Sequence, residues 1–277
     1  MSTQTAVTGR LRRGHPRPPW VGVSWAFGAG PSVIAILAGI VFWEVVGQVA
    51  GFRFFPPFSS VVARLIEMIA AGEIIEPLMG SLRNLAIGFS IAVVLGITVG
   101  LLMGAYKRVE AALDVYVYAL LTAPSLVFAP IMFSIFGLGP EPIIGVIIIY
   151  TIFIIIINTS SAVQSVPRSL IEMGRSYCGS DWQIFRRIII PSALPMIMAG
   201  LRLAGARAVE GMVNGELFIA AVGLGAVIAR AGNRFDSTTV LAVLLLTLTI
   251  AFIVVRVIMF IDHRTTSWLP ETQRGTR

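Results

Sequence analysis

Charged side chains are scarce in this sequence. Asp, Glu, Lys and Arg together make up 13% of its 277 residues, whereas 56% of the residues are hydrophobic and the mean hydropathy is +0.88. A soluble domain usually carries about 25% charged residues, so this chain has too few of them to cover a water-facing surface. The composition therefore predicts an all-α, polytopic membrane protein whose solvent is lipid.

Residues that carry metal, redox or nucleophilic chemistry are also rare. The single cysteine, Cys178, excludes an intramolecular disulfide, and the two histidines, His15 and His263, lie near opposite ends of the chain. The one lysine, Lys107, follows Tyr106 rather than a glycine, which excludes the GxxxxGK[ST] loop that binds nucleotide phosphates. We therefore expect a protein that is not an enzyme and binds no metal or cofactor, so that any ATP and Mg²⁺ would be held by a partner subunit.

Basic residues outnumber acidic ones by 21 to 14, but they lie mostly in short connectors between apolar runs. That placement indicates membrane topology rather than nucleic-acid binding. They concentrate in both tails, at Lys107-Arg108 and in the connector 162–191, so the positive-inside rule predicts that both termini are cytoplasmic. The expected organisation is a flexible cytoplasmic tail at 1–30, a transmembrane domain at 31–265 and a second cytoplasmic tail at 266–277.

Long apolar runs predict about six transmembrane helices, at residues 33–50, 82–106, 111–136, 142–161, 193–221 and 240–261. The residues at 52–80 are too polar to span, because they include Glu67 and Glu73. We expect an amphipathic helix there instead, from Ser59 to about Ala71, on the outer surface.

Glycine and proline give the predicted spans particular shapes. Gly96, Gly100 and Gly104 recur every four residues in the second run and share one helix face, which lets a neighbouring helix approach closely. Pro124 and Pro130 predict a kinked third span, and such kinks are tolerated where the freed carbonyls face protein or a watery path.

The connector 162–191 predicts two short helices joined by a sharp turn. The first would cover 168–178, and Gly179 suits the left-handed residue that stops it. Ser180 and Gln183 form a capping-box pattern that starts the second helix. The local pattern is equally compatible with a rigid knob and with an ordinary ordered loop.

The stretch from Glu172 to Pro191 resembles the EAA loop of ABC importer permeases. Glu172 and the segment Ile188-Ile189-Ile190-Pro191 have the same spacing as in the family. The chain is expected to re-enter the membrane at Pro191. Met173 and Gly174 replace the usual alanines, and Cys178 stands where the family has a glycine. Further matches extend over about residues 40–265 and indicate the sulfonate/nitrate/taurine branch: Trp43-Glu44, Pro56-Pro57-x-Ser59, Ser81-Leu82-Arg83, Asn158-Thr159, Ala199-Gly200-Leu201-Arg202, Glu216-Leu217 and Gly223-Leu224-Gly225.

The resemblance implies a type I ABC importer permease fold with a cytoplasmic coupling helix, in a bacterial plasma (inner) membrane. It implies a second permease copy, forming a homodimer, together with ABC ATPase subunits and an extracytoplasmic solute-binding protein. The solute would be a small anionic organic or inorganic compound. The residues expected to couple the permease to its ATPase are Glu172, Gly174, Arg175, Cys178, Gly179, Asp181 and Pro191.

Polar residues inside the spans are candidates for the translocation path, because ionisable groups in lipid are costly and often functional. Glu210 and Asn214 are four residues apart and share a helix face, although pairing of Glu210 with Arg207 or Arg202 is an equal alternative. A purely structural role is the alternative for Glu216 and for the proline kink. The full predicted set is Pro124, Ser125, Phe128, Glu210, Asn214 and Glu216.

An ion-coupled secondary transporter or channel subunit is the alternative function. It would be indicated by internal repeats, of which the sequence shows none, or by transport without an ATPase. Glu44, an acidic residue in the first predicted span, is expected to be buried and hydrogen-bonded.

Overall fold

The computed structural model describes residues 30–49, 55–219 and 222–265, and both predicted tails lie outside these ranges apart from Gly30. Over the described residues the chain is all-helical, as predicted, and has no strand. Its elements are α1 (Gly30–Val49), α2 (Phe58–Ala70), α3 (Ile75–Ala105), α4 (Lys107–Thr122), η2 (Ser125–Val127), α5 (Phe128–Phe136), α6 (Pro140–Gln164), α7 (Arg168–Ser176), α8 (Asp181–Ile184), η3 (Phe185–Ile189), α9 (Ile190–Ile219), α10 (Gly223–Asn233) and α11 (Ser237–Thr265).

Four described helices are long and apolar enough to cross a membrane: α3, α6, α11 and the continuous helix Asp181–Ile219, which contains α8, η3 and α9. The pair formed by α4 and Ser125–Phe136 is a fifth candidate if it counts as one broken span. The first expected span corresponds to α1, a shorter apolar helix over Val33–Val49. The expected number of six is reached if α1 and the broken pair each cross once.

The third predicted span is not one kinked helix. α4 and the segment Ser125–Phe136 meet at 91°. Ala123, the residue before Pro124, has φ −63° and ψ 139°, the extended conformation that a following proline ring favours, so α4 ends there. Pro130 causes no break, because it lies in the first turn of α5, where its missing N–H costs no helical hydrogen bond.

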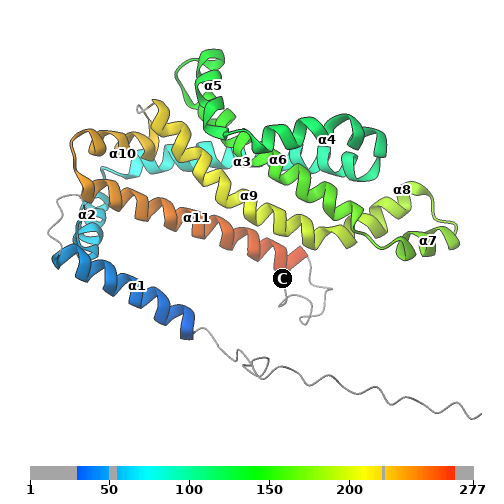
Figure 1. Cartoon of the computed structure of the whole chain (residues 1–277), viewed down its shortest axis with the longest axis horizontal. Helices are drawn as coiled ribbons and strands as arrows, with labels where there is room; N and C mark the ends of the chain where they lie inside the picture. Colours follow the sequence, from blue (N-terminus) through cyan, green and yellow to red (C-terminus); the bar gives the residue numbers. More distant parts are fainter. Residues whose placement is uncertain (1–29, 50–54, 220–221, 266–277) are drawn as a thin grey trace, which may run out of the picture.

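Helix α6 is the centre of the bundle and packs between α3 and α9 (Figure 1). The glycines of α3 face it. A Cβ atom added at Gly96 would lie 2.8 Å from Cβ of Ile155, and one added at Gly100 would lie 2.6 Å from Cβ of Thr159. The predicted close approach along the glycine face is therefore confirmed, with α6 as the partner helix.

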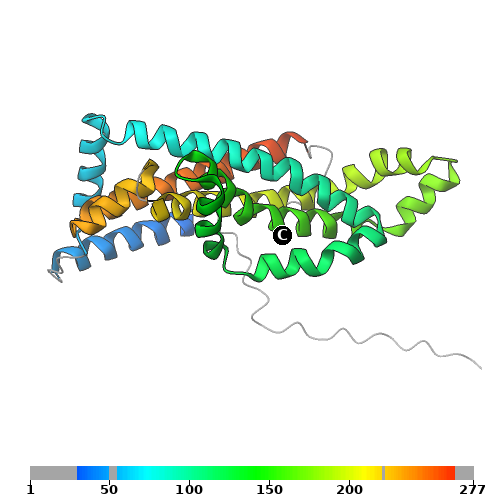
Figure 2. The same cartoon turned by 90° about the horizontal axis from the view of Figure 1, so that it is seen from above.

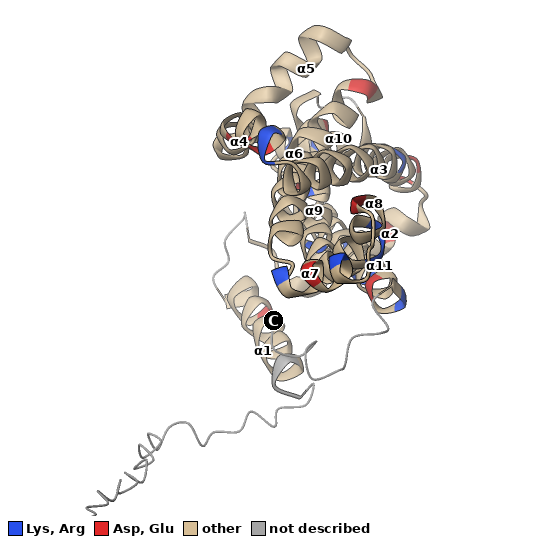
Figure 3. Ribbon diagram, turned by 90° about the vertical axis from the view of Figure 1, so that its right-hand side faces the viewer, with Lys and Arg blue, Asp and Glu red and all other residues tan. Residues whose placement is uncertain are grey.

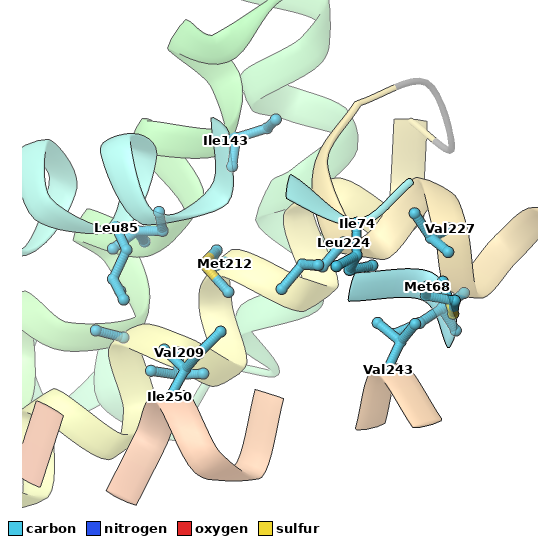
Figure 4. Close-up of a cluster of buried hydrophobic side chains, with 13 residues drawn as sticks. Met68, Ile74, Leu85, Ile143, Val209, Met212, Leu224, Val227, Val243 and Ile250 are labelled. Carbon is cyan, nitrogen blue, oxygen red and sulfur yellow. The ribbon is translucent and has the colours of Figure 1, made fainter. Parts of the chain in front are cut away.

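A hydrophobic cluster joins α2, α3, α6, α9, α10 and α11 (Figure 4). It holds the short helices α2 and α10 against the long ones. The sequence does not predict α10, which has 11 residues and three glycines and is stabilised by burial rather than by helix propensity. The labelled side chains in the cluster are Met68, Ile74, Leu85, Ile143, Val209, Met212, Leu224, Val227, Val243 and Ile250.

The two ends of the bundle differ. Helices α7 and α8 lie at one end, and α2 and α10 lie at the other (Figures 1 and 2). The expected amphipathic helix is confirmed as α2, which buries Val61 and Met68 and leaves Glu67 exposed. Ser59 was expected to cap its start, but the helix begins one residue earlier, at Phe58, with Pro57 as the N-cap residue.

Candidate functional site

Helices α7 and α8 and the turn between them, here called the knob, project from one end of the bundle (Figures 1 and 2) and face the viewer in Figure 3. At the end of α7 the N–H of Cys178 donates to the carbonyl of Arg175 at 2.9 Å, and the N–H of Gly179 donates to the carbonyl of Gly174 at 3.1 Å. Cys178 has φ +55°. These two bonds form a Schellman turn whose left-handed residue is Cys178.

The prediction that Gly179 is the left-handed residue is therefore wrong. The helix stops earlier than the predicted range 168–178, and Cys178 takes the left-handed position itself. Gly179 is needed for a different reason. A Cβ atom there would lie 2.9 Å from the carbonyl oxygen of Gly174, which is the acceptor of its own N–H.

The predicted capping box is confirmed and gives α8 a fixed start. The N–H of Gln183 donates to the hydroxyl of Ser180 at 3.4 Å, and the N–H of Ser180 donates to Oε1 of Gln183 at 2.9 Å. The chain therefore turns from α7 into α8 through two capped helix ends, which favours a rigid knob over an ordinary ordered loop.

Pro191, expected at the re-entry into the membrane, does not interrupt the chain. It is the second residue of α9, inside the continuous helix Asp181–Ile219. The turn before it, Phe185–Ile189, is π-helical. A proline cannot donate to the carbonyl of Arg187 and its ring needs room there, and a wider turn provides that room.

The surface of this projection combines charge with aromatic area. Glu172, Arg175 and Asp181 are exposed, and none of them forms an ion pair within the described part of the chain. Tyr177 is 83% exposed, and Trp182, stacked on Phe185, is 66% exposed. Exposed aromatic residues with charged neighbours are typical of protein–protein contacts.

The core of the same projection is apolar. Gly174 is buried, and a Cβ atom there would lie 2.6 Å from the end of Ile188 and 3.2 Å from Ile184. The knob is thus held by α7 packing onto α8 and η3, which leaves its outer face free for a partner.

An open groove of about 250 Å³ lies on the surface between α9 and α11. Two of the predicted path residues, Glu210 and Asn214, line it together. The remaining lining residues are mostly apolar: Ala206, Val209, Val213, Thr247, Leu248 and Ala251.

Glu210 and Asn214 are each held by a neighbour. Nη1 of Arg207 lies 2.7 Å from Oε2 of Glu210, so the ion pair that was the alternative reading of Glu210 is present. Nδ2 of Asn214 donates to the hydroxyl of Tyr150 on α6 at 3.0 Å. The shared face predicted from their spacing is therefore observed, and the pairing of Glu210 with Arg207 exists beside it.

The fold and these two sites have counterparts among known proteins. The profile of the family described as the binding-protein-dependent transport system inner membrane component matches residues 92–267. The chain belongs to this family. It is the membrane subunit of an ABC importer and a multi-pass protein of the inner membrane.

Individual relatives agree with the assignment of this permease. The formylaminopyrimidine transport permease protein ThiX of Halalkalibacterium halodurans is 32% identical over 204 residues, which are 73% of this chain and 81% of the relative. The nitrate import permease protein NrtB of Synechocystis is 32% identical over 185 residues, 67% of each chain. The inward-facing MetNI methionine ABC transporter shares the fold, with a TM-score of 0.59, 20% identity and coverage of 68% of this chain and 94% of that one.

The other predicted path residues of the permease do not line the groove. Pro124, Ser125 and Phe128 lie at the break between α4 and α5, where η2 contacts α6 and α9. These contacts favour the packing alternative for the proline break.

Glu216 is also outside the groove and has a structural environment in this permease. Its side chain is fully buried, and its Oε2 accepts the N–H of Gly225 at 3.0 Å. Beside it, the hydroxyl of Ser81 accepts the N–H of Leu224 at 2.9 Å, and the carboxyl group fills the space that a side chain at Gly223 would need. These contacts fix the start of α10 and favour the structural alternative for Glu216.

Sequence reasoning missed the groove residue Thr247 and also Tyr150, which does not line the groove but accepts a hydrogen bond from Asn214. Tyr150 lies in a run of isoleucines and is 64 positions from Asn214, so no local pattern connects the two. Thr247 lies in an apolar stretch of α11. A polar side chain inside an apolar span was the one available signal for both.

Proposed function

We propose that two copies of this permease, as a homodimer, form one translocation path for a small solute and that the connector 165–191 docks on ABC ATPase subunits. ATP and Mg²⁺ are bound on those subunits. An extracytoplasmic solute-binding protein delivers the solute, and both termini are cytoplasmic. The finding that carries this proposal is the continuity of the helix Asp181–Ile219.

This one helix links the knob to the groove. It begins in α8, behind the capping box, and it carries Glu210 and Asn214 near its other end. At a rise of 1.5 Å per residue, Asp181 and Glu210 are about 45 Å apart along the axis. A displacement of the knob by a closing ATPase pair would therefore reach the groove along one continuous helix.

The outer face of the knob suits this docking. Tyr177 and Trp182 supply exposed aromatic area, and Glu172, Arg175 and Asp181 supply charges that are not paired within the described chain. Burial of an aromatic anchor with a surrounding polar rim is the usual arrangement of the energetic centre of an interface.

The opposite end suits the solute-binding protein. There a polar pocket of about 190 Å³ lies between α2, α10 and α11, and its charged lining residues are Arg64, Glu73, Arg230, Arg234 and Asp236. Arg64 is paired with Glu73, whereas Arg230 and Arg234 form no ion pair among the described residues and favour a partner with an acidic face.

The test uses proteoliposomes that contain the permease with its ATPase and solute-binding protein. Trp182→Ala and Arg175→Glu should each lower solute-stimulated ATP hydrolysis by more than about tenfold, because both change the docking face. Thermal unfolding of the permease should stay unchanged, since both side chains are exposed.

Glu76→Gln is the matched control, because Glu76 is an exposed acid in the first turn of α3, at the other end of the bundle. This variant should keep full stimulation. Solute uptake driven by an ion gradient without ATP would overturn the proposal in favour of a secondary transporter.

A further inference from the structure

The groove between α9 and α11 offers hydrogen-bond acceptors. Oε1 of Glu210 and Oδ1 of Asn214 have no hydrogen-bond partner among the described residues, since Glu210 accepts from Arg207 through Oε2 and Asn214 donates to Tyr150 through Nδ2. The hydroxyl of Thr247 donates to the carbonyl of Leu244 at 2.8 Å, which leaves its oxygen lone pairs for a donor. Three side chains of the groove therefore present acceptor atoms.

The groove lacks an available cation within the described chain. None of its lining residues is Lys or Arg, and the nearby Arg207 is paired with Glu210 at 2.7 Å. Because the charges of Arg207 and Glu210 offset each other, the groove offers an anion no net electrostatic attraction. The anion would also lose hydration without compensation from the apolar walls.

The walls set the size and polarity of the solute. Five of the eight lining residues are Ala, Val or Leu on two facing helices, with Ala206 and Val209 among them. The volume of about 250 Å³ is below the range of roughly 300–1,000 Å³ that is usual for drug-sized ligands. A small solute with an apolar face and N–H groups along one edge matches these features.

We propose that the groove selects small neutral or singly cationic solutes that carry N–H donors, and that it rejects anions. This proposal rests on the proposed function, because it assigns the solute class of the same path. It departs from the anionic solute that the sequence resemblance implies. Glu210 acts twice: Oε1 accepts from the solute, and Oε2 neutralises Arg207.

The double role of Glu210 makes the preference reversible by one substitution. Glu210→Gln removes the carboxylate and leaves the guanidinium of Arg207 without its charge partner. An unpaired cation then lies beside the groove, so the groove's preference should move from N–H donors to anions. The further change Arg207→Gln removes this cation and should abolish anion binding again. Both side chains are about half exposed, at 52% for Arg207 and 47% for Glu210, so these changes leave the core intact.

The experiment measures binding to the full-length permease in lipid nanodiscs by saturation-transfer NMR, with two probes. Cytosine is a small neutral ring with N–H donors, and methanesulfonate is a small anion. Wild-type permease should contact cytosine and not methanesulfonate. Glu210→Gln should weaken the cytosine contact by about tenfold and create a methanesulfonate contact, and the Arg207→Gln/Glu210→Gln double variant should contact neither probe.

Asn214→Leu should also weaken the cytosine contact, whereas the control Glu76→Gln should behave as wild type. The proposal is overturned if wild-type permease contacts methanesulfonate, if it does not contact cytosine, or if the Glu210 and Asn214 variants contact cytosine as strongly as wild type does. None of these outcomes involves ATP, so they leave the ATP-driven transport function standing. Solute uptake in the absence of ATP would contradict the ATP-driven transport function, independently of the binding result.

Discussion

Glu44 on α1 accepts hydrogen bonds from both the backbone N–H and the hydroxyl of Ser59 on α2, at 2.9 and 2.8 Å. Ser59 is the second residue of α2, so the carboxylate satisfies one of the N–H groups that a helix start leaves without a partner. Nε1 of Trp43 donates to the carbonyl of Pro56 at 3.1 Å. The Trp43-Glu44 and Pro56-Pro57-x-Ser59 motifs thus form one joint between α1 and α2. Glu44 is hydrogen-bonded as expected, but it is partly exposed rather than buried.

Because Glu44 and Ser59 share these bonds, their substitutions should not be additive. Glu44→Ala should lower the midpoint of thermal unfolding in detergent, and adding Ser59→Ala should lower it little further. Glu76→Ala, at an exposed acid outside the joint, serves as the control. Fully additive shifts would show that the two side chains act independently.

The left-handed conformation of Cys178 predicts a stabilising substitution. An L-residue other than glycine pays roughly 1–2 kcal/mol in this conformation, so Cys178→Gly should raise the free energy of unfolding of the α7–α8 turn by about 1 kcal/mol. Hydrogen exchange at the N–H groups of Cys178 and Gly179, which close the turn, should slow correspondingly.

Cys178→Ala is the matched control for this effect, because alanine keeps the Cβ atom and therefore the strain. The N–H groups of residues 178 and 179 should exchange in Cys178→Ala at the wild-type rate. They should exchange faster in Cys178→Val, since a β-branched residue is poorly tolerated at positive φ. Equal protection in the glycine and alanine variants would contradict the argument.

The features predicted correctly from the sequence depend on residues close together in the chain or on helix period. Ser180 and Gln183 are three residues apart, so their capping box needs no tertiary information. The glycines of α3 repeat every four residues, which defines their common face before the partner helix is known. The left-handed residue was misplaced by one position because the end of α7 depends on the packing of Gly174 against Ile188, a tertiary contact.

The candidate site was predictable only in part for the same reason. The spacing of Glu210 and Asn214 placed them on one face, but Tyr150 and Thr247 come from other helices and reach the site through packing alone. The break at Pro124 likewise exceeded the expected kink, since the angle of 91° depends on how α5 packs against α6.

The contact between α3 and α6 predicts opposite effects for two glycines of the same helix. Gly100→Ala should lower the free energy of unfolding by about 1–3 kcal/mol, because the added Cβ atom would meet Thr159 at 2.6 Å and the carbonyl of Ile156 at 2.8 Å. Gly80→Ala should be neutral or raise it by up to about 1 kcal/mol, because the space there is open and alanine favours helix. Chemical denaturation in mixed micelles compares the two, and a loss of stability in both would argue against the close approach.

The contacts of Asp236 predict that the start of α11, where it packs against α2, loses stability in acid. Its carboxylate accepts the N–H of Thr239 at 3.0 Å and the hydroxyl of Thr239 at 2.6 Å, and Nε of Arg64 on α2 donates to the same hydroxyl at 3.1 Å. Burial by itself raises the pKa of Asp236, but the bonds from Thr239 and the charge of Arg64 outweigh it. The pKa therefore lies below its ordinary value of 3.8.

A lowered pKa means that folding favours the ionised form of Asp236. Its contribution to stability is complete above 3.8 and disappears as the pH falls through the lower pKa of the folded state. Asp236→Asn should therefore unfold at a lower temperature than wild type at neutral pH, and the difference should shrink as the pH falls below 3.8. Glu141→Gln, at an exposed acid on α6, should keep the acid dependence of wild type. If the difference in unfolding temperature between Asp236→Asn and wild type stayed constant below pH 3.8, the charge of the carboxylate would not be what stabilises the start of α11.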